Sequence, residues 1–501
     1  MTERRPPRAG VCETHTAILF FVGDRAYKVK KPVDLGFLDY TERAARQAAC
    51  AREVALNRRF APDVYLGLGE VSAPDTEAPE PVVVMRRMPA ERRLSRLVRT
   101  GAPLDDVLRT VARRLATWHA EAPGGRDVVE QGTRDALSSR WEASFAQLRA
   151  LTDGASVPDG VPEIEGLVRR YLAGRETLFD SRIAQGRVVD GHGDLLAEDI
   201  FCLDDGPRVL DCLEFDDHLR YVDGLDDAAF LAMDLERLGA PEAAAFFLTR
   251  YGEYSGDPAP PSLWHHYVAY RAFVRAKVSL IQAEQGAPGA ESAARRLLAT
   301  ALRHLRTAAV GLTLVGGMPG SGKSTLSGAL ADRLEATLLS SDRLRKEMAG
   351  LPPERPATAD YGEGLYTAEW TARTYAALLD RATLLLSAGE SVVLDATWST
   401  EEQRRAAHHV AELTSADLTA LHCQVPEEVA AARLSSRAPG PSDAGLDVAA
   451  VMTAREAAWP EAVTVDTSGP LEQAASRALA TVRPWGTGQA LVFRRPYMEP
   501  D

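Results

Sequence analysis

Cysteine is scarce in this chain, and its cysteines lie far apart. The 501 residues contain five cysteines and no Cys-x-x-Cys pair, so we expect neither a disulfide framework nor a structural metal site built from thiolates. No apolar run is long enough to cross a membrane, and the run at residues 18–22 is too short for the core of a secretory signal. We therefore expect a cytoplasmic protein without a membrane partner.

A strongly basic block is also absent. The chain carries 58 Lys and Arg against 71 Asp and Glu, which gives a formal net charge of −13. A broad electrostatic surface for nucleic acid is therefore not expected, although a local pocket for one phosphate remains compatible with this charge. The length and a hydrophobic content of 45% allow at least two well-cored domains. The sequence does not determine the oligomeric state.

The strongest motif lies in the second half of the chain. Apolar residues 312–315 predict a buried strand, and the pattern Gly-x-x-x-x-Gly-Lys-Ser follows at 317–324 and leads into a helical pattern at 325–334. Glycines let backbone N–H groups turn inward around a polyphosphate, and the helix N-terminus adds a positive dipole end. The motif predicts a phosphate-binding loop for ATP, in which Lys323 reaches the β- and γ-phosphates and Ser324 binds Mg²⁺. The predicted nucleotide ligands are Gly317, Gly320, Ser321, Gly322, Lys323, Ser324 and Thr325.

Further apolar runs follow this motif, with helical patterns between them. Strands are expected at 336–341, 391–394, 418–425 and 462–466, which predicts a parallel α/β sheet with its site at the carboxyl ends of the strands. Asp342 and Asp395 each follow one of these strands, so we expect both at the edge that carries the phosphate-binding loop.

These residues resemble those of small P-loop kinases, of the kind that includes gluconate kinase and the 5′-hydroxyl polynucleotide kinases. The resemblance implies that Asp342 is the base and that Arg345 holds an anionic group of the substrate or the transferring phosphoryl group. It implies that Asp395 is a Walker B-type acid that acts on Mg²⁺. It also implies a mobile lid at 433–443, where Arg433 and Arg437 close on the phosphates, although both arginines are equally typical of a helix surface.

The first half of the chain opens with strands and continues with helices. A hairpin is expected at 17–22 and 25–30, followed by a helix at 41–60 and a strand at 81–85, which together make a small strand-rich lobe. Helical patterns then dominate, and a second hairpin is expected at 199–203 and 207–211. Carboxylates gather on the loops of this region, and carboxylates that converge need a cation. They are Asp194, Asp199, Asp211, Glu214, Asp216 and Asp217.

The segment His192-Gly193-Asp194-Leu195 resembles the catalytic loop of aminoglycoside phosphotransferase-like small-molecule kinases, which share their fold with protein kinases. The resemblance implies that Asp194 is the base that orients and deprotonates the acceptor hydroxyl, and that Asp211 binds the metal. It implies that Lys28, with Lys30 as an alternative, contacts the ATP phosphates and that Glu53 pairs with this lysine. Residues 85–88 correspond to the hinge where adenine would bind.

The chain departs from that family in two ways. Asp199 replaces the family's asparagine as a second Mg²⁺ ligand, which changes the charge of the site. The glycine-rich phosphate loop of protein kinases is missing, as it is in many small-molecule relatives.

Two polar features of the helical region also need an interpretation. His119 ends an apolar helical face and is interpreted as a packing residue rather than a ligand. Arg271 and Arg275 lie on the apolar stripe of one helix, so each must find a carboxylate or an anionic ligand. Pairing with an aspartate at 223, 226 or 227 is the favoured interpretation, and contact with an anionic substrate is the alternative.

The sequence therefore predicts two kinase modules. A bilobal α+β protein-kinase-like domain is expected over residues 1–307, with its N-lobe at about 15–88 and its C-lobe at about 89–307. An α/β P-loop domain with a parallel sheet should follow at 308–485, before a C-terminal extension at 486–501. The expected function is ATP- and Mg²⁺-dependent phosphotransfer to a hydroxyl of a small molecule such as a sugar, amino sugar or polyol. The alternative is a 5′-hydroxyl nucleotide or nucleic-acid kinase with an N-terminal ATP-binding regulatory module.

Overall fold

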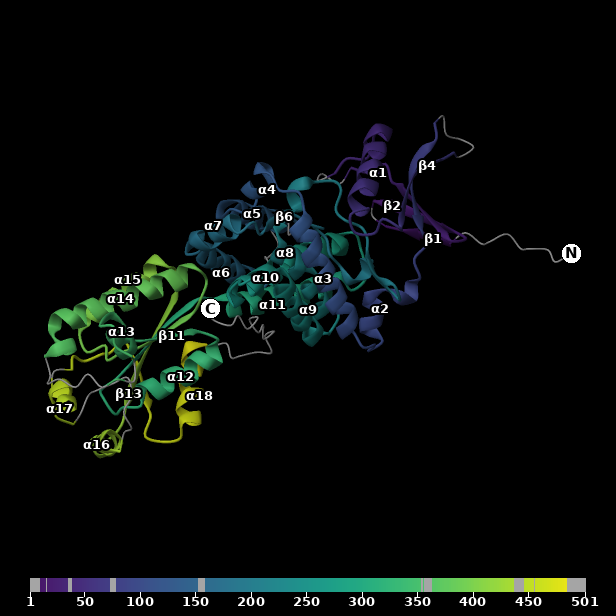
Figure 1. Cartoon of the computed structure of the whole chain (residues 1–501). Helices are drawn as coiled ribbons and strands as arrows, with labels where there is room; N and C mark the ends of the chain where they lie inside the picture. The colour runs from purple at the N-terminus through teal and green to yellow at the C-terminus, as the bar shows by residue number, and fades with distance from the viewer. Residues whose placement is uncertain are drawn as a thin grey trace.

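Figure 1 shows a computed structural model in which the chain passes through three successive bodies: a small lobe, a helical lobe and an α/β domain. The structure describes residues 10–14, 16–34, 38–72, 78–151, 158–352, 355, 363–436, 446–454 and 456–483. Within these ranges, no helix has both the length and the apolar character that a membrane crossing requires. The predicted C-terminal extension at 486–501 lies outside the described residues.

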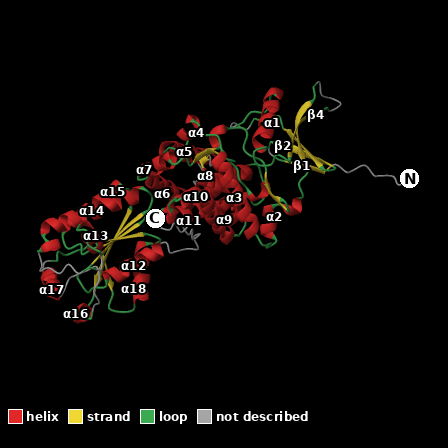
Figure 2. Ribbon diagram, viewed as in Figure 1, coloured by secondary structure: helices red, strands yellow, loops and turns green. Residues whose placement is uncertain are grey.

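The N-lobe is a five-stranded antiparallel sheet with one helix packed against it (Figure 2). The hairpin at residues 17–30 and the strand at 81–85 are confirmed, whereas the first and fourth strands were missed. The glycines of β4 weaken its strand pattern, which explains one of the two omissions. The sheet has the order β1-β2-β3-β5-β4, and its elements are β1 (Gly10–Glu13), β2 (Ala17–Val22), β3 (Arg25–Lys30), α1 (Arg43–Asn57), β4 (Tyr65–Val71) and β5 (Glu80–Arg86).

The C-lobe is helical, and α8 and α10 pack together within its buried core. Its short strands β6 (Val188–Asp190) and β9 (Tyr221–Asp223) pair and bring the loop after β6 close to the start of α8. The helices are α2 (Leu94–Arg99), α3 (Asp105–Glu121), α4 (Arg126–Glu130), α5 (Arg134–Leu151), α6 (Val161–Ala173), α7 (Glu176–Ala184), α8 (Gly224–Arg237), α9 (Pro241–Ser255), α10 (Pro261–Glu284) and α11 (Ala290–Ala308).

The second hairpin connects the two lobes. Its strands β7 (Ile200–Leu203) and β8 (Gly206–Val209) pair as the sequence predicted. Phe201 and Leu210 are buried in the hydrophobic core of the N-lobe, although they belong to a segment that follows most of the C-lobe helices. The hairpin therefore positions the residues at its base, Asp199 and Asp211, in the space between the lobes.

The C-terminal domain is built on a five-stranded parallel sheet of order β11-β12-β10-β13-β14, which confirms the predicted α/β architecture. Alternate residues of each strand serve different cores: Leu314 lies on the face continuous with the C-lobe, and Val315 on the face covered by α12 and α18. The strands are β10 (Gly311–Gly316), β11 (Thr337–Ser340), β12 (Val392–Asp395), β13 (Asp417–Gln424) and β14 (Val463–Asp466). The helices are α12 (Lys323–Leu334), α13 (Ser341–Met348), α14 (Ala368–Ser387), α15 (Glu401–Leu413), α16 (Glu427–Ser435), α17 (Leu446–Ala454) and α18 (Leu471–Val482). The boundary expected near residue 308 falls between α11 and β10.

The C-lobe and the P-loop domain pack directly on each other. One hydrophobic core runs from the C-lobe helices into the sheet of the P-loop domain. Polar contacts reinforce it: Arg170 pairs with Asp417 at 2.7 Å, and the buried Arg175 donates through Nη1 to the carbonyl of Thr414 at 2.7 Å. Because the contact is both apolar and hydrogen-bonded, we expect these two parts to move as one body.

Candidate active sites

The phosphate-binding loop connects β10 to α12, as the sequence predicted. Gly317, Gly320 and Gly322 have φ values of 137°, 81° and 85°, which side-chain-bearing residues rarely adopt. A Cβ at Gly320 would lie 2.8 Å from the carbonyl of Ala430, so the packing against α16 also requires glycine there. The loop leads directly into α12, whose first residues are Lys323, Ser324 and Thr325.

The carboxyl ends of three strands bring acidic and hydroxyl side chains to this loop. In the parallel register Asp395 lies beside both Val315 and Ser340, so β11, β10 and β12 end together. Burial raises the pKa of Asp395 and the charge of Asp342 adds to the rise, whereas Lys323 and hydrogen bonding from Ser324 and Ser340 oppose it. Among the described residues the buried Oδ1 of Asp395 has no hydrogen-bond partner, which suits a hydrated cation beside the loop.

Asp342 and Arg345 lie one turn apart on α13, because the helix begins at Ser341 and the preceding strand ends at Ser340. The guanidinium of Arg345 is buried, stacks 4.9 Å from the ring centre of Tyr366 and donates to the carbonyl of Leu365 at 2.8 Å. Its Nε has no hydrogen-bond partner among the described residues. Arg345 is therefore fixed at the side of the site opposite α16, with part of its donor capacity unused.

A cavity of about 330 Å³ lies beside the phosphate-binding loop. Arg433 reaches it from the last turn of α16 and donates to the carbonyls of Thr467 at 2.7 Å and Gly320 at 3.4 Å, so this arginine packs on the loop rather than lying free on a helix surface. Arg437 and most of the predicted lid lie outside the described residues. The cavity is lined by Gly320, Gly322, Lys323, Ser324, Thr325, Leu326, Arg433, Leu434, Thr467, Gly469, Leu471 and Ala474.

The N-terminal site is organised around Glu53, whose buried carboxylate lies on α1. Lys28 approaches one of its oxygens at 2.9 Å and Lys30 the other at 2.7 Å, so the two lysines that the sequence offered as alternatives both pair with it. Lys28 also pairs with Asp211 of the C-lobe at 2.6 Å, and Lys30 pairs with Glu214. Burial opposes the charge of Lys28, but Asp211, Glu53 and Glu214 together raise its pKa well above the usual value.

Three of the predicted acidic residues act on one another electrostatically at this site. Burial raises the pKa of Asp194 to about 6, the Arg275 charge lowers it and the Asp211 charge raises it. Burial also raises the pKa of Asp199 well above its usual range, and Asp211 and Asp194 add to this rise. Lys28 is the main reason why the pKa of Asp211 is lowered. The mutual repulsion of these carboxylates fits a site that takes a cation.

The prediction that all six acidic residues converge on this point was wrong. Asp217 pairs with Arg52 and Arg220, and Asp216 accepts from the backbone N–H of His218 at the start of a short turn. Their neighbours in space supply arginines and a turn amide, which sequence spacing does not reveal. Among the described residues, no group of three His, Cys, Asp or Glu side chains is arranged as a ready-made metal site. The Mg²⁺ ligands therefore stay predictions, with phosphate oxygens needed to complete the shell.

Sequence reasoning missed the residue that anchors the catalytic-loop segment. Asp227 on α8 is fully buried and accepts from the backbone N–H groups of His192 at 2.8 Å and Gly193 at 2.9 Å. It also lies 3.0 Å from Nε2 of His119, which places that histidine in the packing, as predicted. Two adjacent acidic residues inside the apolar run at 225–235 were the available signal, because such groups are buried only with partners.

Asp226, the other of these two acidic residues, is the partner of one of the two arginines on the apolar stripe of α10. Arg271 forms a two-point ion pair with Asp226, at 2.7 and 2.9 Å, which confirms the favoured interpretation for this arginine. Arg275, one turn further along α10, makes no hydrogen bond or ion pair with any described residue.

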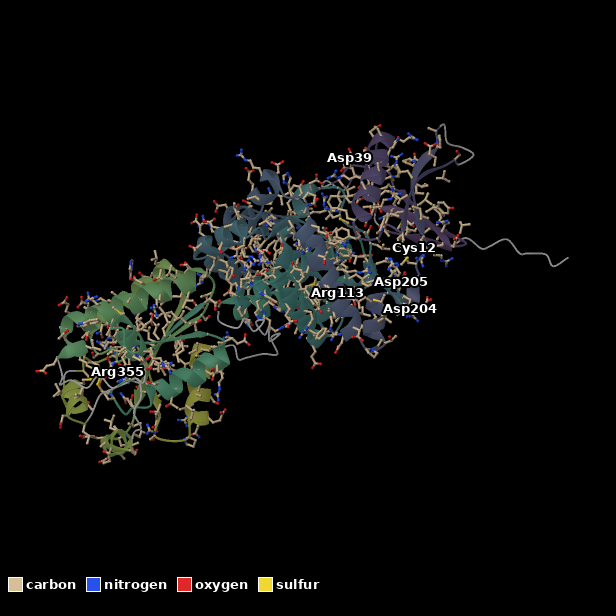
Figure 3. All side chains as sticks on the ribbon, in the orientation of Figure 1. Cys12, Asp39, Arg113, Asp204, Asp205 and Arg355 are labelled. Atoms are coloured by element: carbon tan, nitrogen blue, oxygen red, sulfur yellow. The ribbon has the colours of Figure 1, made fainter. Side chains whose placement is uncertain are left out.

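The two candidate sites are well separated. Asp204 and Asp205, at the turn of the hairpin that carries Asp199 and Asp211 at its base, lie far from Arg355 of the P-loop domain in Figure 3. None of the described residues assigned above to one candidate site belongs to the other.

Comparison with known proteins gives both full-length and partial matches. A family model described as an AAA domain matches residues 312–458. Uncharacterized protein Rv2004c of Mycobacterium tuberculosis strain H37Rv is 43% identical over 474 residues, which cover 94% of this chain and 95% of that protein.

Solved structures match the two parts of the chain separately. The GDP and kanamycin complex of APH(2")-IIia is 15% identical, with a TM-score of 0.38, and the match covers 60% of this chain and 94% of that one. An unliganded sugar kinase from Janibacter sp. HTCC2649 is 21% identical, with a TM-score of 0.27, over 35% of this chain and 97% of that one. The 43% identity over nearly the full length of both chains shows that this chain belongs to the same family as the mycobacterial protein Rv2004c.

Proposed function

We propose that the chain is an ATP-dependent phosphotransferase with two active sites, each of which moves a γ-phosphoryl group to a hydroxyl of a small molecule. The observation that carries this proposal is the cavity beside the phosphate-binding loop, whose wall includes Lys323 and Ser324. Next to Ser324, a buried oxygen of Asp395 has no hydrogen-bond partner within the described part of the chain. Bound ATP with Mg²⁺ would supply the phosphoryl group and the ADP leaving group.

In the P-loop site, each residue is assigned a role in phosphate transfer from its position. Lys323 lies at the start of α12, where its charge and the helix dipole oppose the negative charge of the phosphates. Asp342 takes the proton of the acceptor hydroxyl as the oxygen–phosphorus bond forms and the bond to the bridging oxygen breaks. Arg345 holds an anionic group of the acceptor or of the transferring phosphoryl group. Arg433 and the predicted lid residue Arg437 close the opposite side.

In the N-terminal site, Asp194 is the base and Lys28 contacts the phosphates. A base whose pKa lies near 6 is mostly ionised at neutral pH and still accepts a proton readily, which suits this role. Asp199 and Asp211 provide carboxylates for Mg²⁺. Because Lys28 pairs with Asp211, bound nucleotide and Mg²⁺ would compete with this ion pair for both side chains.

The acceptor class is a sugar, amino sugar or similar polyol, because both families that the sequence resembles act on such hydroxyls. Nucleic acid is a less suitable acceptor, since a net charge of −13 opposes binding to a polyanion. We further propose that the protein is cytoplasmic, where ATP is supplied.

The test is phosphate transfer from γ-labelled ATP to a panel of sugars, sugar acids, amino sugars, aminoglycosides and RNA 5′-ends. The intact chain is compared with Lys323→Ala, Asp194→Ala and the surface control Arg295→Ala, whose partner Glu291 is equally exposed. Loss of a different product in each of the first two variants is the expected result. A product that forms at an unchanged rate in both variants contradicts the proposal.

A second candidate is that the N-terminal half binds ATP without transferring phosphate and regulates the other half. Asp199 in the place of asparagine and the ion pair of Lys28 with Asp211 favour this alternative, because both change how a nucleotide–metal complex would bind. It predicts that Asp194→Ala leaves every product unchanged while Lys323→Ala abolishes all transfer.

A further inference from the structure

Arg275 is a partly buried cation whose charge acts on Asp194, the proposed base of the N-terminal site. It lies on α10, and no described residue forms a hydrogen bond or an ion pair with it. The buried arginines Arg182 and Arg271 of the same lobe each bind aspartate carboxylates. An arginine that keeps its donors free next to an active site has unused capacity for an anionic ligand.

The position of Arg275 is fixed by its neighbours on the helix. Arg271, one turn earlier, is held by the two-point ion pair with Asp226 and stacks 4.8 Å from the ring centre of Phe230, so the rotation of α10 against α8 is defined. Residues four apart share one face of a helix, so Arg275 continues this face towards the end of α10.

The catalytic-loop segment is hydrogen-bonded to α8 on both sides of Asp194. Asp227 holds the N–H groups of His192 and Gly193, and Asp234, two turns further along α8, accepts from the N–H of Ala197 at 3.0 Å. The backbone is therefore hydrogen-bonded to α8 on both sides of Asp194, and α8 packs against α10, the helix that carries Arg275. Of the charged groups around Asp194, Arg275 acts on it most strongly.

We propose that Arg275 binds an anionic group of the acceptor, so that the N-terminal site phosphorylates a hydroxyl compound carrying a carboxylate or a phosphate. This inference rests on the proposed phosphotransferase function of that site. A planar guanidinium forms paired hydrogen bonds to either anion, and the hydroxyl of the same molecule then faces Asp194. A polycationic acceptor is disfavoured, because it would have to place positive charge beside Arg275.

The experiment uses the full chain with Lys323→Ala, which silences the P-loop site. Transfer rates are compared for glucose, glucosamine and kanamycin, for the sugar acids gluconate and glucuronate, and for glucose 1-phosphate. Arg275→Met is then introduced, with Lys277→Met as the matched control. Lys277 lies two residues away on α10, and its Nζ donates to Gln147 at 2.5 Å on another face of the helix.

We expect an anionic acceptor to be preferred, and Arg275→Met to raise its KM about 10- to 100-fold, the loss expected for a charge-assisted hydrogen bond. The KM for glucose should change less than twofold, and Arg275→Lys should restore part of the affinity. Sugar acids and the sugar phosphate identify which anion is bound. Protection against thermal unfolding by the preferred acceptor, measured without ATP, should weaken in Arg275→Met and not in Lys277→Met.

The other outcomes separate the two proposals. If the N-terminal site transfers phosphate but prefers neutral or cationic acceptors, or if Arg275→Met changes all acceptors equally, the arginine only tunes Asp194 and the inference fails. If the Lys323→Ala chain transfers phosphate to none of the compounds and none protects it, the proposed function of the N-terminal site fails, and the inference fails with it.

Discussion

Replacing Asp227 with asparagine should both destabilise the C-lobe and impair the N-terminal site. The carboxylate is fully buried and accepts two backbone N–H groups, and it lies within hydrogen-bond distance of His119. An asparagine keeps one acceptor oxygen and directs an NH₂ group at donors on its other side. The loss of a buried charge with its hydrogen bonds costs about 3 to 5 kcal/mol of the free energy of unfolding.

The effect on catalysis follows from what the hydrogen bonds hold. His192 and Gly193 directly precede Asp194, so releasing them allows the base to move by a fraction of its side-chain length. A displacement of about 1 Å reduces a rate roughly 100-fold. We expect kcat for the N-terminal product to fall by this order while the affinity of the P-loop site for ATP stays unchanged, because that site lies at the far end of the molecule.

The assay combines urea unfolding with steady-state transfer on protein that is still folded. Asp106→Asn is the matched control, since Asp106 is 96% exposed on α3 and the substitution removes the same charge. The low pKa of Asp227 adds a pH test: its stabilisation should be present above the unperturbed pKa of 3.8 and be lost as the pH falls below it. An Asp227→Asn protein with wild-type stability, or with an N-terminal kcat within twofold of wild type, would refute this reasoning.

Three further predictions concern acid–base behaviour, the domain contact and the phosphate-binding loop. Because burial raises the pKa of Asp194 to about 6, kcat/KM for the N-terminal product should fall tenfold per pH unit below about pH 6. The native state also binds this proton more tightly than the unfolded chain, so the ionised Asp194 lowers the free energy of unfolding at pH 7. Asp194→Asn should therefore raise the midpoint of urea unfolding at that pH. A Cβ at Gly174 would lie 2.0 Å from a backbone carbonyl of the P-loop domain, so Gly174→Ala should lower stability by about 1 to 3 kcal/mol and expose the domain junction to proteases, whereas Gly166→Ala, in open space on the same helix segment, should stabilise slightly. Gly320→Ala should weaken ATP binding, measured by calorimetry, at least tenfold, because the φ of 81° disfavours a side chain and the new Cβ would lie 2.8 Å from the carbonyl oxygen of Ala430. The control Gly328→Ala, whose Cβ would have no neighbour within 4 Å, should bind ATP normally.

Local sequence patterns were sufficient to predict an element wherever its structure depends on residues close together in the chain. The apolar run before Gly317 and the helical pattern after it defined the phosphate-binding loop, because both periodicities are set by neighbours in the sequence. The hairpins at 17–30 and 200–209 were found for the same reason. The missed strand β4 has two glycines in seven residues, and it is held by pairing with β5, a partner that local sequence does not specify.

Sequence determined the residue types and spacing of both candidate sites, and the two-module architecture. Tertiary structure alone decided which charges meet. Glu53 pairs with two lysines at once, because both lie on one face of β3 opposite α1. Arg271 and Arg275 occupy the same helical stripe, yet among the described residues only Arg271 forms an ion pair, with Asp226 of α8. Spacing fixes the face on which a charge lies, whereas the packing of distant elements decides whether an opposite charge lies close enough to form an ion pair with it.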